Sequence, residues 1–216
     1  MSPSPISPKP ANRRTAETPR QKTRSRIAAA AKAEFLEVGY ETASIEGIAR
    51  RAGVSRATYY IHFTNKVEVL VEIWHTSIDK DILEIIADFD ALGAFPTRSA
   101  LRKWIDKAVS YWEKSADMVE LTAQVLALDP QMTGPWVELN VQAVNAMPNY
   151  LSRFSTRELP LARMRMSMLL LQLDRMCFIL NRGELPQGRP VLIDALTDIW
   201  WRCLKPEADD ERKERR

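Results

Sequence analysis

Glycine is scarce in this chain of 216 residues, and so are runs of alternating β-branched residues. Only 7 glycines are present. A sequence with few chain-reversing glycines and little two-residue alternation favours helices over strands. Hydrophobic residues make up 45% of the chain, which is enough to fill a buried core. We therefore expect an all-α protein with about nine helices.

The residue types that build metal and catalytic centres are also rare. The chain has two histidines, His62 and His75, and two cysteines, Cys177 and Cys203. No Cys/His cluster has metal-binding spacing, and no glycine-rich loop is placed to cradle a phosphate. No nucleophile with a matching base is recognisable. We expect no enzyme, no metal and no cofactor, and we interpret both cysteines as core thiols, with a disulfide as the alternative.

Long hydrophobic runs are missing as well. No apolar stretch approaches the ~18 residues of a membrane-spanning helix, and the N-terminus has no apolar signal segment. We expect a cytoplasmic protein that does not enter a membrane.

Positive charge is unevenly distributed along the chain. The net charge is only +3, yet the first 32 residues oppose one acid, Glu17, with eight basic residues: Lys9, Arg13, Arg14, Arg20, Lys22, Arg24, Arg26 and Lys32. A basic arm before a less basic body is typical of proteins that bind nucleic acids. We interpret residues 1–19, rich in proline and serine, as a disordered arm and residues 205–216 as a charged tail.

Between these ends the apolar periodicity predicts two parts. Residues 20–66 carry short helices, and residues 67–204 carry all six tryptophans. The expected helices span residues 18–38, 44–52, 55–61, 65–89, 98–114, 116–128, 134–154, 161–182 and 190–204. Pro148 lies inside one of them and should kink or split it.

The stretch around Gly53 has the pattern of a helix-turn-helix. A glycine between two short helices supplies a backbone conformation that a β-carbon resists. Ser44 and Ser55 are good N-caps for the two helices, and the N-terminus of the second favours a phosphate. Arg56 at its start is placed to reach a base edge.

The segment "SIEGIARRAGVSRATYYIHFTNKVEVL" resembles the DNA-binding signature of the TetR family of bacterial transcriptional regulators. The resemblance covers roughly residues 22–70 and implies a three-helix DNA-binding domain. It implies phosphate contacts at Ser44, Thr58, Tyr60, His62 and Lys66, and base contacts at Arg56, Ala57 and Ile61. Tyr59 and Phe63 are expected to pack in the core. The alternatives are a helix-end hydrogen bond for His62 and a solvated side chain for Arg56.

The same resemblance implies that residues 67–204 dimerise and sense a small molecule. The apolar segment "RMRMSMLLLQLDRMCFIL" and the last helix would pack against their copies as a four-helix bundle. The two recognition helices would then lie roughly 34–36 Å apart, one turn of DNA.

Aromatic residues from different helices predict either a filled core or a ligand cavity. The candidates for the cavity are Trp104, Tyr111, Trp136, Phe178 and Trp200. The carboxyl half also resembles the mycobacterial ethionamide-resistance repressor between Asp174 and Glu184, which implies a tunnel near Leu170 and Leu173. For the pair Asp174-Arg175 we favour a structural ion pair over a ligand-binding or catalytic carboxylate.

The sequence thus predicts a homodimeric repressor that binds a (pseudo)palindromic DNA operator and is released by a small hydrophobic effector. The alternatives are a regulator without a ligand, an activator, and a helical enzyme or lipophile-binding protein.

Overall fold

The computed structural model of the chain describes residues 18–77, 79–93 and 95–205. Within these ranges it contains α helices, one 3-10 turn and no strand, so the predicted all-α class is confirmed. In chain order the elements are α1 (Pro19–Val38), α2 (Ile45–Arg51), α3 (Arg56–His62), α4 (Lys66–Ser77), α5 (Asp79–Ala91), α6 (Arg98–Lys114), α7 (Ala116–Leu128), η1 (Pro130–Met132), α8 (Thr133–Asn145), α9 (Pro148–Leu151), α10 (Leu159–Asn181) and α11 (Gly188–Leu204).

The first helix shows how local signals fix an element. The Thr18 hydroxyl accepts the backbone N–H of Gln21, and the Gln21 side chain accepts the backbone N–H of Thr18, which forms a capping box. Ile27, Ala31 and Phe35 recur at helical spacing and form its buried face. The helix ends at Gly39, whose φ of 83° is strained for a residue with a β-carbon.

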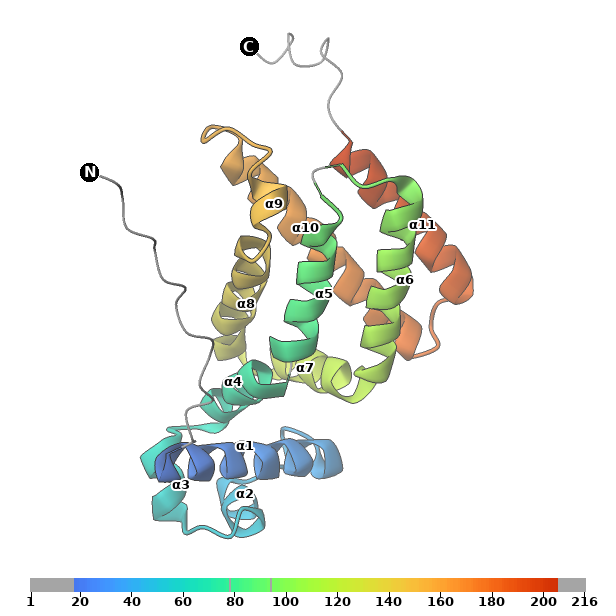
Figure 1. The fold of residues 1–216 in the computed structure, drawn as a ribbon. Coiled ribbons are helices and arrows are strands. Elements are labelled where there is room, and N and C mark those ends of the chain that lie inside the picture. The colour runs from blue at the N-terminus through green and yellow to red at the C-terminus, as the bar shows by residue number, and fades with distance from the viewer. Residues whose placement is uncertain (1–17, 78, 94, 206–216) are drawn as a thin grey trace, which may run out of the picture.

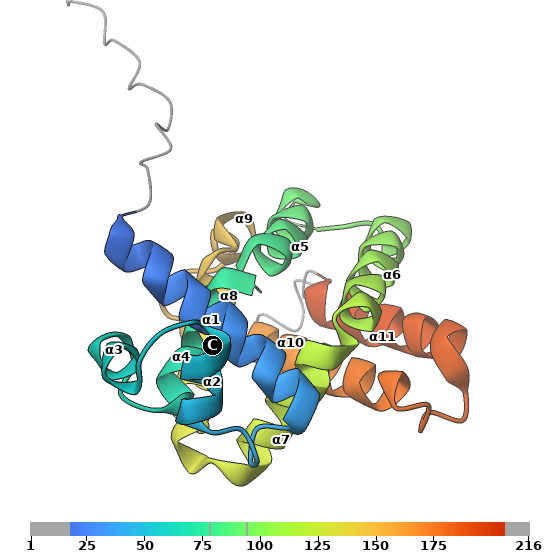
Figure 2. The same cartoon turned by 90° about the horizontal axis from the view of Figure 1, so that it is seen from below.

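The molecule is built around two hydrophobic clusters. Helices α1, α2 and α3 lie at one end, and α4 leads from them toward the larger part formed by α5 to α11 (Figure 1). One cluster joins α1–α4 to α7 and η1, which contribute Met118, Leu121, Val125 and Met132. The other joins α5, α6 and α8–α11. Figure 2, from below, shows α1 crossing the base of the molecule while α10 and α11 lie side by side away from α3. Helix α7 therefore belongs to residues 67–204 in sequence and to the amino-terminal cluster in packing.

The predicted helix over residues 65–89 is helical on both sides of Ile78, as α4 and α5. It is not one straight helix, because α4 and α5 point in different directions (Figure 1). The two helices serve different cores: Trp74 of α4 lies in the amino-terminal cluster, whereas Ile85 and Phe89 of α5 lie in the other. One straight helix would have to place both apolar faces in a single cluster. Ile78, which the prediction placed inside the helix, lies outside the described residues.

The predicted break at Pro148 is confirmed. Helix α8 ends at Asn145, and Pro148 begins the short helix α9. The buried carboxylate of Asp90 accepts the backbone N–H groups of Asn149 at 3.1 Å and Tyr150 at 2.8 Å. The new helix start, which Pro148 creates, is thereby satisfied and tied to α5.

Two of the predicted cavity residues form the core instead. The rings of Trp104 and Trp200 lie 5.1 Å apart, and each also contacts Phe89, with centroid distances of 4.9 Å and 5.8 Å. Both tryptophans are buried, and the Trp104 indole donates to the backbone oxygen of Ile85 at 2.8 Å. These aromatic side chains fill the space between α5, α6 and α11, so they line no cavity there.

The prediction for the cysteines holds for one of them. Cys177 is buried and free, as expected of a core thiol. Cys203 is also free but exposed, because it falls on the outer side of α11, and the prediction of a core position is wrong for it.

Replacing Trp104 should therefore affect folding. Trp104→Ala removes a buried ring and a buried hydrogen bond, so we expect the free energy of unfolding to fall by about 3–5 kcal/mol. Urea denaturation followed by circular dichroism measures this loss. Trp201→Ala, at a half-buried ring on α11, is the control and should cost clearly less. A small loss of stability together with a large loss of ligand affinity would restore Trp104 to a binding site.

Candidate nucleic-acid interface and ligand cavity

The helix-turn-helix forms around Gly53. The side chain of Ser44 caps α2 by accepting the N–H of Gly47, and Ser55 caps α3 by accepting the N–H of Thr58. Between them Gly53 has a φ of 63°, and its neighbour Val54 donates back to the carbonyl of Ala49. The glycine turn that the sequence predicts is thus present with both caps.

Helix α3 divides its side chains between packing and solvent. Tyr59 and Phe63 are buried, and their rings contact each other at 5.9 Å, as the sequence predicts. Tyr60 and Ile61 point outward, with 44% and 66% of their surface exposed. The short helix is therefore held from behind, and its outer face remains accessible to a partner.

Arg56 and Ala57 lie exposed at the start of α3, where the prediction places base contacts. The Arg56 guanidinium forms an ion pair with Glu46 of α2 and lies 3.5 Å from the Tyr60 hydroxyl. All three side chains are largely exposed, so this pairing is weak and can exchange for a base edge.

The hydroxyl residues predicted to contact phosphate have structural tasks as well. Ser44 is exposed, and because its oxygen accepts an N–H, its own hydrogen stays available as a donor. Ser55 and Thr58 share one hydrogen between their hydroxyl oxygens at 2.8 Å, which leaves one further donor for a phosphate.

His62 lies half-buried at the end of α3. Its pKa is lowered by burial and by the nearby charges of Arg20 and Arg24, which favours the neutral ring at pH 7. Its buried Nδ1 has no hydrogen-bond partner in the described part of the chain, so the alternative of a helix-end bond through that atom is not realised. The contact expected with phosphate would be made by a neutral N–H donor.

Lys66 has a different role from the predicted one. Its ammonium donates to the backbone oxygens of Tyr40 at 2.7 Å, Ala43 at 3.0 Å and Glu41 at 3.3 Å. Three acceptors use all three N–H groups of a lysine, so none points to a phosphate in this arrangement. Burial lowers its pKa. The prediction of a phosphate contact is therefore corrected: Lys66 holds the loop between α1 and α2.

Arg24, counted with the basic amino-terminal residues, is likewise used inside the domain. Its Nε donates to Glu72 of α4 at 2.9 Å, and its guanidinium lies 4.1 Å from the centre of the Phe63 ring. It joins α1, α3 and α4, and is half-buried.

A substitution at Lys66 separates the two roles. Lys66→Met keeps the apolar stem but removes three hydrogen bonds, so we expect the free energy of unfolding to fall by about 1–3 kcal/mol. The slope of log affinity against log salt should stay unchanged, whereas a lost phosphate contact would reduce it by about 0.9. Urea unfolding and DNA titrations at several salt concentrations measure both quantities. Lys103→Met, at an exposed position of α6, is the control. A reduced slope with full stability would contradict this assignment.

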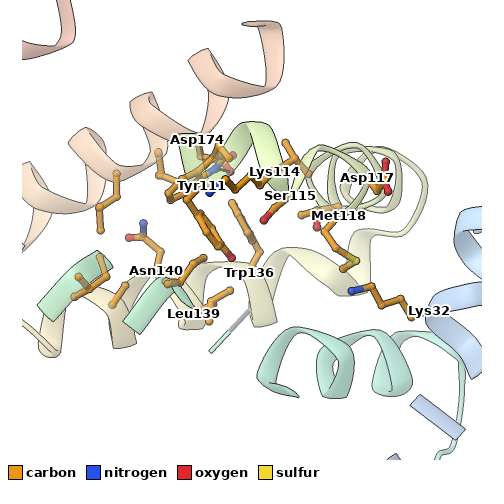
Figure 3. A pocket seen from close by; sticks show the side chains of 18 of the residues that line it. Lys32, Tyr111, Lys114, Ser115, Asp117, Met118, Trp136, Leu139, Asn140 and Asp174 are labelled. Carbon is orange, nitrogen blue, oxygen red and sulfur yellow. Dashed lines mark hydrogen bonds between the residues drawn. The ribbon is translucent and has the colours of Figure 1, made fainter. Parts of the chain in front are cut away.

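A cavity of about 310 Å³ lies between helices of both parts of the molecule (Figure 3). Its wall comes from α5, α6, α7, α8 and α10 of the regulatory half and from α1 of the amino-terminal part. A second cavity of about 260 Å³ adjoins it and shares Trp136, Leu171 and Asp174. These volumes suit a compact small molecule.

The predicted ligand residues separate into two groups. Tyr111, Trp136 and Leu170 line the larger cavity, and Phe178 lines the adjoining one. Trp104, Leu173 and Trp200 are buried in the core and line neither cavity, so the prediction is corrected for these three.

Sequence reasoning missed most of the wall. Trp112 is buried beside the cavity, and its indole donates to Asp174, which we expected to form an ion pair with Arg175. Lys32 and Leu36 reach the cavity from α1. The cavity draws on six helices, so no contiguous motif marks it. The one sequence signal that points to the cavity is Asp174, a charged residue inside the apolar run of α10.

This geometry defines a helix-turn-helix protein with a separate helical domain that encloses a cavity. Residues 27–73 match the sequence model of a family described as "Bacterial regulatory proteins, tetR family". The amino-terminal part of the chain, from α1 to α4, is thus similar to the DNA-binding domain of the TetR family of bacterial transcriptional regulators.

Individual relatives agree with this assignment. The chain is 37% identical over 68 residues to the HTH-type transcriptional activator FasR of Mycolicibacterium smegmatis, covering 32% of this chain and 31% of FasR. It is 46% identical over 50 residues to the HTH-type transcriptional regulator SrpR of Pseudomonas putida, covering 23% and 24%. The chain therefore spans about a third or less of each relative.

The fold extends over most of the molecule. A solved structure assigned to the TetR family from Mesorhizobium loti MAFF303099 superposes with a TM-score of 0.59 at 20% identity, covering 87% of this chain and 97% of the other. At this identity the match concerns the fold. The similarity of the carboxyl half to the ethionamide-resistance repressor stays a prediction from sequence. No helix in the described ranges combines the length and apolarity needed to cross a membrane.

Proposed function

We propose that this chain is a homodimeric transcriptional repressor that binds a (pseudo)palindromic operator and is released by a small lipophilic effector. The observation that carries the proposal is the cavity wall: Lys32 and Leu36 of α1 face the same space as Trp136 of α8 and Leu170 of α10. A molecule in this space touches the DNA-binding domain directly. Its occupancy can therefore bias how the two parts are oriented, provided that it binds one orientation more tightly.

A second connection runs through α4. Trp136 lines the cavity and packs against Trp74 of α4, with ring centroids 5.7 Å apart. The buried Trp74 indole donates to the hydroxyl of Thr122, another cavity residue, at 3.2 Å. Displacement of α7 or α8 by an effector would thus move α4, which leads directly into the helix-turn-helix.

Support for a dimer comes from apolar side chains left outside the cores. Met164 and Met168 on α10 are 60% and 63% exposed, and Leu161, Val191 and Ile199 on α10 and α11 are also exposed. A second copy of the same pair of helices would cover them across a two-fold axis.

Activation is the second candidate. FasR, which matches only part of this chain, is named an activator. A reporter gene behind the operator, in cells with and without this protein, distinguishes lower expression from higher. A compound that raises the melting temperature without changing DNA binding would instead indicate a lipophile-binding protein without regulation.

DNA binding is tested with the DNA that flanks the protein's own gene. In a mobility-shift assay we expect Arg56→Ala to weaken operator binding by about 1–3 kcal/mol, because a base contact is lost, while binding to unrelated DNA changes little. Arg102→Ala, on α6, is the control and should leave both affinities unchanged. Equal losses on operator and unrelated DNA would contradict a base-reading role for Arg56.

Dimerisation is tested by placing a charge on the exposed apolar face. Met168→Glu should convert the dimer to a monomer in sedimentation experiments, because two carboxylates would be desolvated at the interface. It should also weaken operator binding at protein concentrations where the wild type is dimeric. Val137→Glu, at an exposed apolar position of α8, is the matched control. A Met168→Glu protein that stays dimeric would place the interface elsewhere.

A further inference from the structure

One charged group in the cavity wall, the carboxylate of Asp174, is half-buried. It projects from α10 into the space between the two adjoining cavities. One of its oxygens accepts the Trp112 indole N–H at 3.0 Å. Among the described residues no side chain forms an ion pair with it, since the neighbouring Arg175 lies over the ring of Phe178 at 5.1 Å. Its second oxygen is therefore left for a ligand.

Aromatic rings surround this carboxylate. Tyr111 and Trp112 come from α6, and Trp136 comes from α8. Figure 3 shows Tyr111 and Trp136 on the side of the cavity where Asp174 lies. The faces of such rings carry partial negative charge and attract cations, most strongly where water is excluded. A carboxylate among aromatic rings is a site for a positively charged group.

Of the other charged residues that line the cavity, Lys32 and Asp117 are seen away from Asp174 in Figure 3, and Lys114 is seen between Asp117 and Asp174. Lys114 and Asp117 are exposed, and Lys32 is half-buried. Lys32 and Lys114 carry two positive charges against the one negative charge of Asp117, and water and salt screen the two exposed residues. An acidic ligand held by Lys32 and Lys114 is the alternative, and it would leave Asp174 without a partner.

Burial raises the pKa of Asp174, while the Trp112 hydrogen bond and the Arg175 charge lower it. Raising the pKa by burial means that the charged form is disfavoured in the empty protein. The attraction of a cation bound beside the carboxylate would offset that penalty.

We propose that the effector is a compact lipophilic amine whose ammonium group binds Asp174 and whose apolar body lies against Trp136 and Leu170. This inference rests on the proposed function, because it assigns a ligand class to the same cavity. The sequence analysis predicted a small hydrophobic effector, and this inference adds a positively charged group to it.

Three probes with one carbon skeleton test the ligand class: 4-phenylbutylamine, 4-phenylbutan-1-ol and 4-phenylbutanoic acid. Isothermal titration calorimetry on the full chain measures their dissociation constants at neutral pH and low salt. We expect the amine to bind tightest, by at least about tenfold over the alcohol, as a hydrogen bond to a charged group implies.

Substitution at Asp174 identifies the group responsible. Asp174→Asn keeps an oxygen for Trp112 but removes the charge, so the amine should bind at least about tenfold more weakly. The affinity for the alcohol should stay within about twofold, which also shows that the variant is folded. Asp194→Asn removes an exposed carboxylate on α11, outside both cavities, and should change the amine affinity by less than about twofold.

The outcomes separate this inference from the proposed function. If the acid binds tightest, or if Asp174→Asn weakens the amine and the alcohol equally, the amine assignment is wrong although the cavity binds ligands. If none of the three probes binds, the amine assignment fails. A separate thermal-shift screen with neutral lipophilic compounds then decides whether the ligand-responsive function itself survives.

Discussion

The contact between Trp74 and the α7–α8 region is the interaction on which the rest of the structure depends. The Trp74 side chain is 1% exposed, and its indole N–H donates to the hydroxyl of Thr122 on α7. This buried hydrogen bond joins α4 to α7. The cavity forms beside it, because Thr122 and Trp136 turn their other surfaces toward that space.

Such an arrangement makes the two halves of the molecule share one core. Helices α1 to α4, which include the helix-turn-helix, and helix α7 bury their side chains in the same cluster. Burial of this kind is cooperative, since moving one helix uncovers apolar surface on the others. The Tyr40 hydroxyl adds a polar link by donating to Asp129 at 3.1 Å. A signal that reaches α7 therefore changes the packing around α1 and α4 together.

Sequence reasoning succeeded where the determinants are local. The caps at Ser44 and Ser55, the turn at Gly53 and the break at Pro148 each depend on residues within one turn of the chain, and the structure contains all four. The outward and inward faces of α3 also follow from helical spacing.

Prediction from sequence failed where the role of a side chain depends on residues that are distant in the sequence and packed against it. An apolar stripe on α6 or α11 marks buried side chains but does not tell a packed Trp104 from a ring that faces a cavity. The role of Lys66 depends on backbone carbonyl oxygens 23–26 residues away. Every residue has such an oxygen, so the sequence does not indicate which ones Lys66 contacts. No proline or glycine marks the change of direction between α4 and α5, whose apolar side chains pack in two different clusters.

The three carbonyl contacts of Lys66 have a mechanical consequence. They fasten the loop that follows α1 to the first residue of α4, while Arg24 fastens α1 to the middle of α4 through Glu72. Clamped at both places, helices α1 to α4 resist internal deformation. A displacement at the far end of α4 would thus rotate helices α1 to α4 as one rigid body. In the proposed dimer, a small rotation of this kind would change the distance between the two copies of α3.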